Sequence, residues 1–200
     1  EFNWIAEFIN QSNNYNIIIA PHDIDNQTIE KLTSALQRPI QRYSQIKNFK
    51  EQIKESILLV DTIGDLKYLY QNCDVAYVGG GFEKGPHNLL EPLVYGKPII
   101  AGHNIKKFPM AKLLADNELV MLLKAPNEIE TKVNFCLSLD SKKFEKKSTI
   151  PPYHEKLGMT KDEYDKYVKI WDQRKYTKVA GGEVQLMLSE DSDKNWVINV

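Results

Sequence analysis

Short apolar runs separated by amphipathic stretches dominate the first 140 residues. The runs lie at residues 16–20, 57–60, 75–79, 98–101 and 119–123. Continuous apolar runs of this length are typical of strands buried on both faces of a parallel sheet. Between them, apolar residues recur at helical spacing, as at Trp4, Phe8 and Ile9. Strands alternating with helices predict a doubly wound, Rossmann-like parallel sheet with helices on both faces.

The pattern changes after residue 140. Residues 140–147 are mostly charged, and Pro151-Pro152 follows them. We therefore expect an α/β domain at 1–140, a linker at 141–152 and a small α+β module of unknown role, possibly truncated, at 153–200. In this last part, a helical pattern runs from Tyr164 to Trp171, and alternating residues predict two antiparallel strands at 184–188 and 196–200.

Composition excludes several function classes. The formal net charge of -1 gives no basis for nucleic-acid binding. Cys73 and Cys136 lack metal-type spacing and are typical of small buried apolar residues. No apolar run approaches the length of a membrane span. The sequence begins with Glu1 rather than Met, so we expect a fragment of a longer protein.

The most informative stretch is glycine-rich and runs from Tyr77 to Pro92. Gly79, Gly80, Gly81 and Gly85 allow a sharp turn that brings the backbone close to a ligand. Asn88 is a suitable cap for a following helix, whose amino-terminal N–H groups would favour phosphate. The spacing matches neither a P-loop nor the dinucleotide fingerprint. The glycine turn followed by a helix start favours a nucleotide or a sugar phosphate as ligand.

Three motifs in this region resemble those of a known family. His87-Asn88-Leu89-Leu90-Glu91-Pro92, after the glycine turn, is similar to the His-Asn-x-Leu-Glu-Pro segment of the 3-deoxy-D-manno-octulosonic acid (Kdo) transferases. Residues 61–66, Asp-Thr-Ile-Gly-Asp-Leu, resemble the family's Asp-Thr-x-Gly-Glu-Leu, and residues 95–100 resemble its Gly-x-Pro-Val-Ile segment. The resemblance covers about residues 1–140. It implies the nucleotide-sugar-binding, C-terminal half of a GT-B glycosyltransferase.

The resemblance also implies a donor site at the carboxyl ends of the strands. In it, Glu91 accepts hydrogen bonds from the ribose hydroxyls, and N–H groups near Gly81, His87 and Asn88 hold phosphate. The predicted donor-binding residues are His22, Thr62, Ile63, Gly64, Gly80, Gly81, Gly85, His87, Asn88 and Glu91. Two residues depart from the family pattern. Pro86 replaces a glycine and removes an N–H donor, and Asp65 replaces a glutamate.

By the same resemblance, the complete protein is an inverting enzyme that transfers Kdo from CMP-Kdo to a lipid A precursor in lipopolysaccharide synthesis. The acceptor and the catalytic carboxylate belong to an N-terminal half outside this sequence. We therefore expect no catalytic residue here, and a soluble fragment that is inactive alone. The resemblance further implies no metal, no cofactor, and a parent protein associated with the cytoplasmic face of the bacterial inner membrane.

Two alternatives remain open at the level of sequence. The donor of a related GT-B transferase would be a UDP- or GDP-sugar, and competition among CMP, UDP and GDP would separate these cases. A non-catalytic α/β scaffold or binding module would bind no nucleotide.

Overall fold

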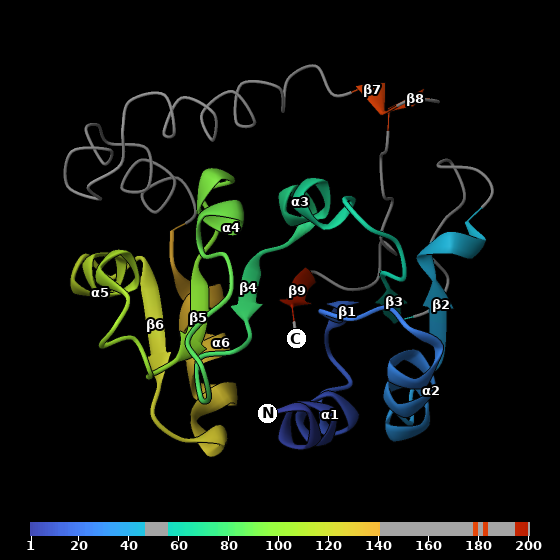
Figure 1. The fold of residues 1–200 in the computed structure, drawn as a ribbon, viewed down its shortest axis with the longest axis horizontal. Coiled ribbons are helices and arrows are strands. Elements are labelled where there is room, and N and C mark those ends of the chain that lie inside the picture. The colour runs from blue at the N-terminus through green and yellow to red at the C-terminus, as the bar shows by residue number, and fades with distance from the viewer. Residues whose placement is uncertain (47–55, 141–177, 180–181, 184–194, 200) are drawn as a thin grey trace. The chain divides into compact units, whose positions relative to one another are not determined.

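The computed structural model describes residues 1–46, 56–140, 178–179, 182–183 and 195–199 (Figure 1). The described residues form two compact units. The first contains residues 1–77 together with the described strands near the C-terminus, and the second contains residues 78–140. Each unit is described separately below.

The first unit is built around a parallel sheet. Its elements are α1 (Phe2–Gln11), β1 (Asn16–Ala20), α2 (Asn26–Ala35), β2 (Ile40–Arg42), β3 (Ile57–Leu59), α3 (Leu66–Leu69) and β9 (Asn195–Asn199), with 3-10 turns at Tyr43–Gln45 and Tyr70–Asn72. The strands lie in the order β2-β3-β1-β9, and each neighbouring pair is parallel. Ile17 to Ile19 are each 1% exposed, as a strand covered on both faces requires.

Amphipathic helices supply much of the remaining core of this unit. On α1, Ile5, Phe8 and Ile9 are buried. Helix α2 begins after Asp25, whose carboxylate accepts a hydrogen bond from the Thr28 backbone N–H at 3.0 Å. This N-cap satisfies one of the donors that a helix start leaves unpaired, and the hydrogen bonds from Thr28 lower the pKa of Asp25.

The second unit contains the segment that carries the glycine motif. Strand β4 (Val75–Val78) leads into this unit. The elements of the unit are α4 (Leu90–Val94), β5 (Ile99–Gly102), α5 (Pro109–Asp116), β6 (Val120–Leu123), a 3-10 turn at Pro126–Glu128 and α6 (Ile129–Ser138). Strands β5 and β6 are parallel, with Ile99 opposite Val120. Helix α6 contacts both strands. Leu90, Leu93, Leu114 and Val120 belong to one buried cluster in this unit.

The fold class predicted from the sequence is therefore confirmed. All five predicted strands are present within one or two residues of the expected ranges, and the weaker pattern near residues 39–47 contains β2. No helix in the described residues is long and apolar enough to cross a membrane.

The carboxyl-terminal strand has a different partner from the one predicted. Strand β9 pairs in parallel with β1, with Ile17 opposite Trp196, whereas an antiparallel strand was predicted here; its predicted partner, 184–188, lies outside the described residues. A short antiparallel pair does form upstream, between β7 (Lys178–Val179) and β8 (Gly182–Glu183). The linker predicted at 141–152 and the helix predicted near 164–171 lie outside the described residues.

Candidate functional site

The glycine segment that follows β4 folds into a tight loop closed by its own backbone. The Gly80 carbonyl accepts hydrogen bonds from the N–H groups of Glu83, at 3.1 Å, and Gly85, at 2.9 Å. The His87 N–H donates to the Gly79 carbonyl at 2.9 Å. We call residues 79–87 the glycine loop. Its turn requires glycine at Gly80 and Gly85, where φ is +85° and +124°.

This geometry corrects one detail of the predicted phosphate site. The backbone N–H of His87 is already used inside the loop, so the structure does not offer it to a ligand. The His87 ring lies beside Gly80: a Cβ placed on Gly80 would be 3.3 Å from His87 Nε2. His87 thus shapes the glycine loop, whereas its predicted contact with a ligand stays a prediction.

Asn88 and Glu91 form a hydrogen-bonded pair at the start of α4. The Asn88 side-chain oxygen accepts from the Leu90 N–H at 3.0 Å, and its amide donates to Glu91 Oε1 at 3.1 Å. Asn88 thus closes a turn one residue before the N-cap of α4, which is Leu89 and has no side-chain cap bond, so the predicted N-cap at Asn88 is wrong by one residue. Glu91 lies in the first turn and is partly exposed. Helix α4 has only five residues, so its dipole is small and the carboxylate itself is the principal polar feature here.

The remaining predicted residues lie in the first unit, in loops after two neighbouring strands. His22 follows β1, and Thr62, Ile63 and Gly64 follow β3. Because β1 and β3 are parallel neighbours, both loops leave the same edge of the sheet. Their convergence on one ligand with the residues of the glycine loop and α4 remains a prediction.

The loop after β3 is held at both ends and exposes an apolar residue between them. The Asp61 carboxylate accepts hydrogen bonds from the Ser44 N–H and hydroxyl, at 2.9 and 2.7 Å. The Thr62 hydroxyl donates to Asp65 at 2.5 Å. Ile63 is 86% exposed, although it follows a fully buried strand. An exposed aliphatic side chain on a fixed loop suits contact with a flat apolar surface such as a nucleotide base.

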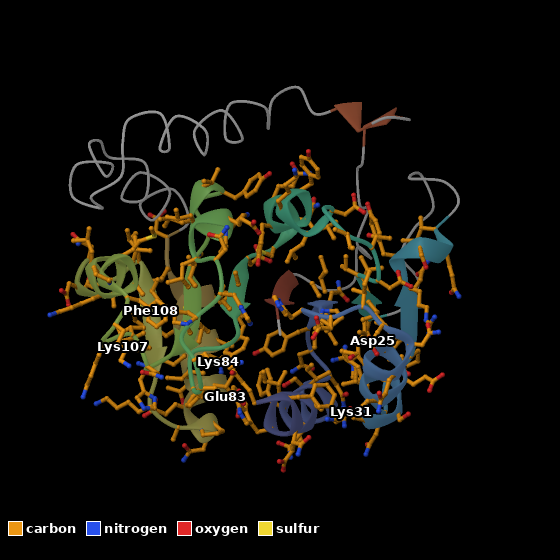
Figure 2. All side chains as sticks on the ribbon, in the orientation of Figure 1. Asp25, Lys31, Glu83, Lys84, Lys107 and Phe108 are labelled. Carbon is orange, nitrogen blue, oxygen red and sulfur yellow. The ribbon has the colours of Figure 1, made fainter. Side chains whose placement is uncertain are left out.

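His22 borders a small cavity of about 220 Å³ in the first unit. Phe2, Thr28 and Lys31 also line the cavity, and Lys31 Nζ lies 5.7 Å from the centre of the Phe2 ring. Lys31 projects from α2, whose N-cap Asp25 is labelled with it in Figure 2. Three ionisable side chains line the cavity, His22, Lys31 and the acidic Asp23, so its lining does not by itself select an anionic ligand group.

A further set of residues, not predicted from the sequence, contacts the glycine loop. Gly102 ends β5, and the segment after it approaches the glycine loop through Asn104 and Phe108. The available signal was a glycine at the end of a buried strand, followed closely by an asparagine. No group of three or more His, Cys, Asp or Glu side chains in the described residues is placed to hold a metal ion.

Comparison with known proteins gives matches to several curated transferases. No family model matches the sequence. A 3-deoxy-D-manno-octulosonic acid transferase of Aquifex aeolicus is 33% identical over 135 residues, which are 66% of this chain and 36% of that protein. A second such transferase, from Chlamydophila psittaci, is 53% identical over 51 residues, or 24% of this chain and 12% of that protein. The predicted resemblance to the Kdo transferases is confirmed.

A third relative has a composite name. A bifunctional glycosyltransferase/methyltransferase of Fusobacterium nucleatum is 40% identical over 100 residues, which cover 49% of this chain and 16% of that protein. The chain thus spans only a minor part of the curated relatives that it matches, at most 36% of the three described here.

A solved structure supports the same fold. The C-terminal CMP-Kdo binding domain of WaaA from Acinetobacter baumannii matches with a TM-score of 0.54 at 17% identity. The match covers 74% of this chain and 95% of that domain. At this identity the likeness establishes the fold alone, a Rossmann-like α/β domain.

Proposed function

We propose that this chain is the donor-binding part of a glycosyltransferase that uses CMP-Kdo. The observation that carries the proposal is the Asn88–Glu91 pair, set directly after the glycine loop in a segment similar to the Kdo transferases. The fold shared with a CMP-Kdo binding domain supports the choice of CMP as the nucleotide.

Glu91 is the proposed ribose-binding group. Its carboxylate accepts the bond from Asn88 Nδ2 at 3.1 Å. Ribose hydroxyls would donate to the same carboxylate, and such charge-assisted hydrogen bonds are the strong ones in a site of this kind. Asn88 fixes the direction of the carboxylate before the ligand arrives, which reduces the entropy cost of binding.

The glycine loop and the predicted contacts of the first unit complete the proposal. The loop at Gly80, Gly81 and Gly85 lacks side chains that would keep a phosphate away from the backbone. His22, Thr62, Ile63 and Gly64 stay predicted donor contacts. In transfer from CMP-Kdo, CMP is the leaving group. The site would stabilise the negative charge that develops on CMP as its bond to the sugar breaks.

The activity of the complete protein is also a proposal. By its relatives, it would transfer Kdo with inversion to a lipid A precursor at the cytoplasmic face of the inner membrane, without a metal ion. The acceptor site and the catalytic carboxylate would lie in another part of the protein, so this chain alone would not catalyse transfer.

Calorimetric titration of the 200-residue chain tests the nucleotide proposal. We expect CMP to bind with a Kd at least about tenfold lower than that of UDP or GDP, and EDTA to leave the affinity unchanged. Preferential binding of UDP or GDP would favour another GT-B donor. No binding of any nucleotide would favour a non-catalytic scaffold and overturn the proposal.

A further inference from the structure

The glycine loop does not hold its shape alone. A second loop in the same unit, residues 103–108 between β5 and α5, meets it along its length. The Asn104 backbone N–H donates to the Gly81 carbonyl at 2.8 Å. The Asn104 side-chain amide donates to the Glu83 carbonyl at 2.6 Å. One partly buried residue thus binds two carbonyls of the glycine loop.

Steric contacts reinforce these hydrogen bonds. A Cβ placed on Gly81 would lie 2.5 Å from the Gly102 nitrogen, and one on Gly102 would lie 2.3 Å from the Gly81 carbonyl carbon. Neither glycine has a positive φ, so space, rather than backbone conformation, requires glycine at both positions. The two backbones are in direct contact where β5 ends.

A third contact lies further along the glycine loop. A Cβ on Gly85 would lie 2.0 Å from the Phe108 ring, which therefore fills the space over that residue. Figure 2 labels Phe108 and Lys107 on the 103–108 loop, and Glu83 and Lys84 on the glycine loop. Gly81, Glu83 and Gly85 are all contacted from the same segment, 102–108.

The contacting segment is itself fixed to the core of the unit. Ile105 is 8% exposed and belongs to the buried cluster, against which Phe108 also packs. His103 Nδ1 lies 3.2 Å from the Leu123 carbonyl, and its ring meets Phe82 edge-on, with centroids 5.5 Å apart. The 103–108 loop is thereby tied to β6 and to the core on one side and to the glycine loop on the other.

We propose that Asn104 is a positioning residue for nucleotide binding, which acts by holding the glycine loop in its binding shape. The inference rests on the proposed function, because it assumes that the glycine loop and the Asn88–Glu91 pair bind CMP. Asn104 needs no contact with the ligand. The His87 N–H closes the glycine loop by donating to the Gly79 carbonyl, and Asn88 follows His87 directly in the chain. The shape of the glycine loop therefore affects where Asn88 lies.

The physical consequence is a population effect. A loop that samples several shapes binds with an affinity reduced by the fraction of time spent in the competent shape. Removal of the Asn104 amide leaves the backbone bond to Gly81 but removes the bond to Glu83. We expect Asn104→Ala to raise the Kd for CMP about tenfold.

Asn117→Ala is the matched control. Its side-chain amide also donates to a backbone carbonyl, that of Leu113, at 2.8 Å, and it is also partly buried in the second unit. It lies at the end of α5 rather than on the glycine loop. Both substitutions remove the same kind of hydrogen bond, so we expect comparable losses in Tm, with the Kd for CMP raised in Asn104→Ala alone.

Calorimetric titration with CMP, thermal melts and amide hydrogen exchange of residues 79–87 form the test. Asn104→Ser, which keeps a small polar side chain, provides a second variant for the same measurements. Support requires weaker CMP binding and faster exchange of the glycine loop in the Asn104 variants than in Asn117→Ala. Wild-type affinity in both Asn104 variants, or an equal loss in Asn117→Ala, overturns the inference. Failure of the wild-type chain to bind CMP overturns the proposed function instead, and this inference with it.

Discussion

At the scale of single residues, the most consequential contact is the hydrogen bond between Asn88 and Glu91. It places a carboxylate in the first turn of a short helix, directly after the glycine loop. A purely structural hydrogen-bonded pair and a ligand-binding carboxylate share this geometry. They differ in what the negative charge contributes, because the bond to Asn88 needs only an acceptor oxygen whereas ribose hydroxyls gain from the charge.

Glu91→Gln separates these two roles, because it keeps the shape of the side chain and removes its charge. We expect CMP affinity to fall about tenfold or more, since hydrogen bonds to charged groups contribute about 1.5–3 kcal/mol. Stability should change by less than about 1 kcal/mol, the usual size of a first-turn charge effect. Calorimetric titration and a thermal melt measure the two effects.

Glu130→Gln is the control, because Glu130 is also a first-turn acid, on the exposed side of α6. It should leave the Kd for CMP unchanged. If Glu91→Gln binds CMP like the wild type but melts far lower, Glu91 is structural and the proposed site is wrong.

The pairing of Asn88 with Glu91 was easier to predict than the contacts that support the glycine loop. Asn88 and Glu91 stand out because a helix start and a family motif depend on residues close in sequence. Asn104 was missed because its bonds to Gly81 and Glu83 span about twenty residues and depend on where β5 ends. The engaged N–H of His87 was missed for a related reason, since the curl of a glycine-rich loop is poorly encoded in its sequence.

At the scale of elements, features set by neighbouring residues were likewise predicted, and features set by distant residues were not. Strands such as 16–20 and 57–60 were predicted because an unbroken apolar run identifies a strand buried on both faces. Their bounds agree closely with β1 and β3. Alternation at 196–200 correctly predicted a strand, but periodicity contains no information about its partner. The parallel pairing with β1, about 180 residues away in the chain, could therefore not be predicted from this pattern.

A single arginine joins several elements of the first unit. Arg38 donates to the carbonyls of Ser12 and Tyr15, each at 2.6 Å, and to the Ser56 hydroxyl at 3.2 Å. These acceptors lie between α1 and β1 and just before β3. Burial lowers the pKa of Arg38, yet guanidinium remains charged at any ordinary pH.

Arg38→Lys should therefore destabilise the chain even though it keeps the charge. An ammonium on a flexible stem does not reproduce the planar fork that reaches all three acceptors. We expect the free energy of unfolding to fall by about 1–3 kcal/mol in urea titrations followed by circular dichroism. Arg42→Lys, on partly exposed β2, is the control. It should change the free energy of unfolding by less than about 0.5 kcal/mol. Equal urea midpoints for the two variants would contradict this account of Arg38.

At the scale of the whole molecule, each unit contains one cysteine. Cys73 in the first unit is 1% exposed, and Cys136 in the second is 2% exposed. The Cys73 thiol also donates to the Tyr70 carbonyl at 3.1 Å. Both positions agree with the sequence-based view of these residues as small buried groups. The two thiols therefore report separately on the opening of the two units.

Burial also sets the acid–base behaviour of one thiol. It raises the pKa of Cys136 to about 12, with Lys132 opposing the shift. In the unfolded chain a cysteine ionises near pH 8.5. Between about pH 8.5 and 12 the unfolded state therefore loses a proton that the folded state keeps. By linkage, the contribution of Cys136 to stability declines as pH rises through this window.

Thiol labelling tests this description of both units. At pH 8 in native buffer, we expect N-ethylmaleimide to modify Cys73 and Cys136 at least about 100-fold more slowly than in denaturant, because each must await local or global opening. Peptide mass spectrometry assigns the rate to each residue. The rate for Cys136 should rise between pH 8 and 10 as the folded state loses stability. Rapid native labelling at either cysteine would show that its unit does not enclose the thiol and would contradict the packing described for that unit.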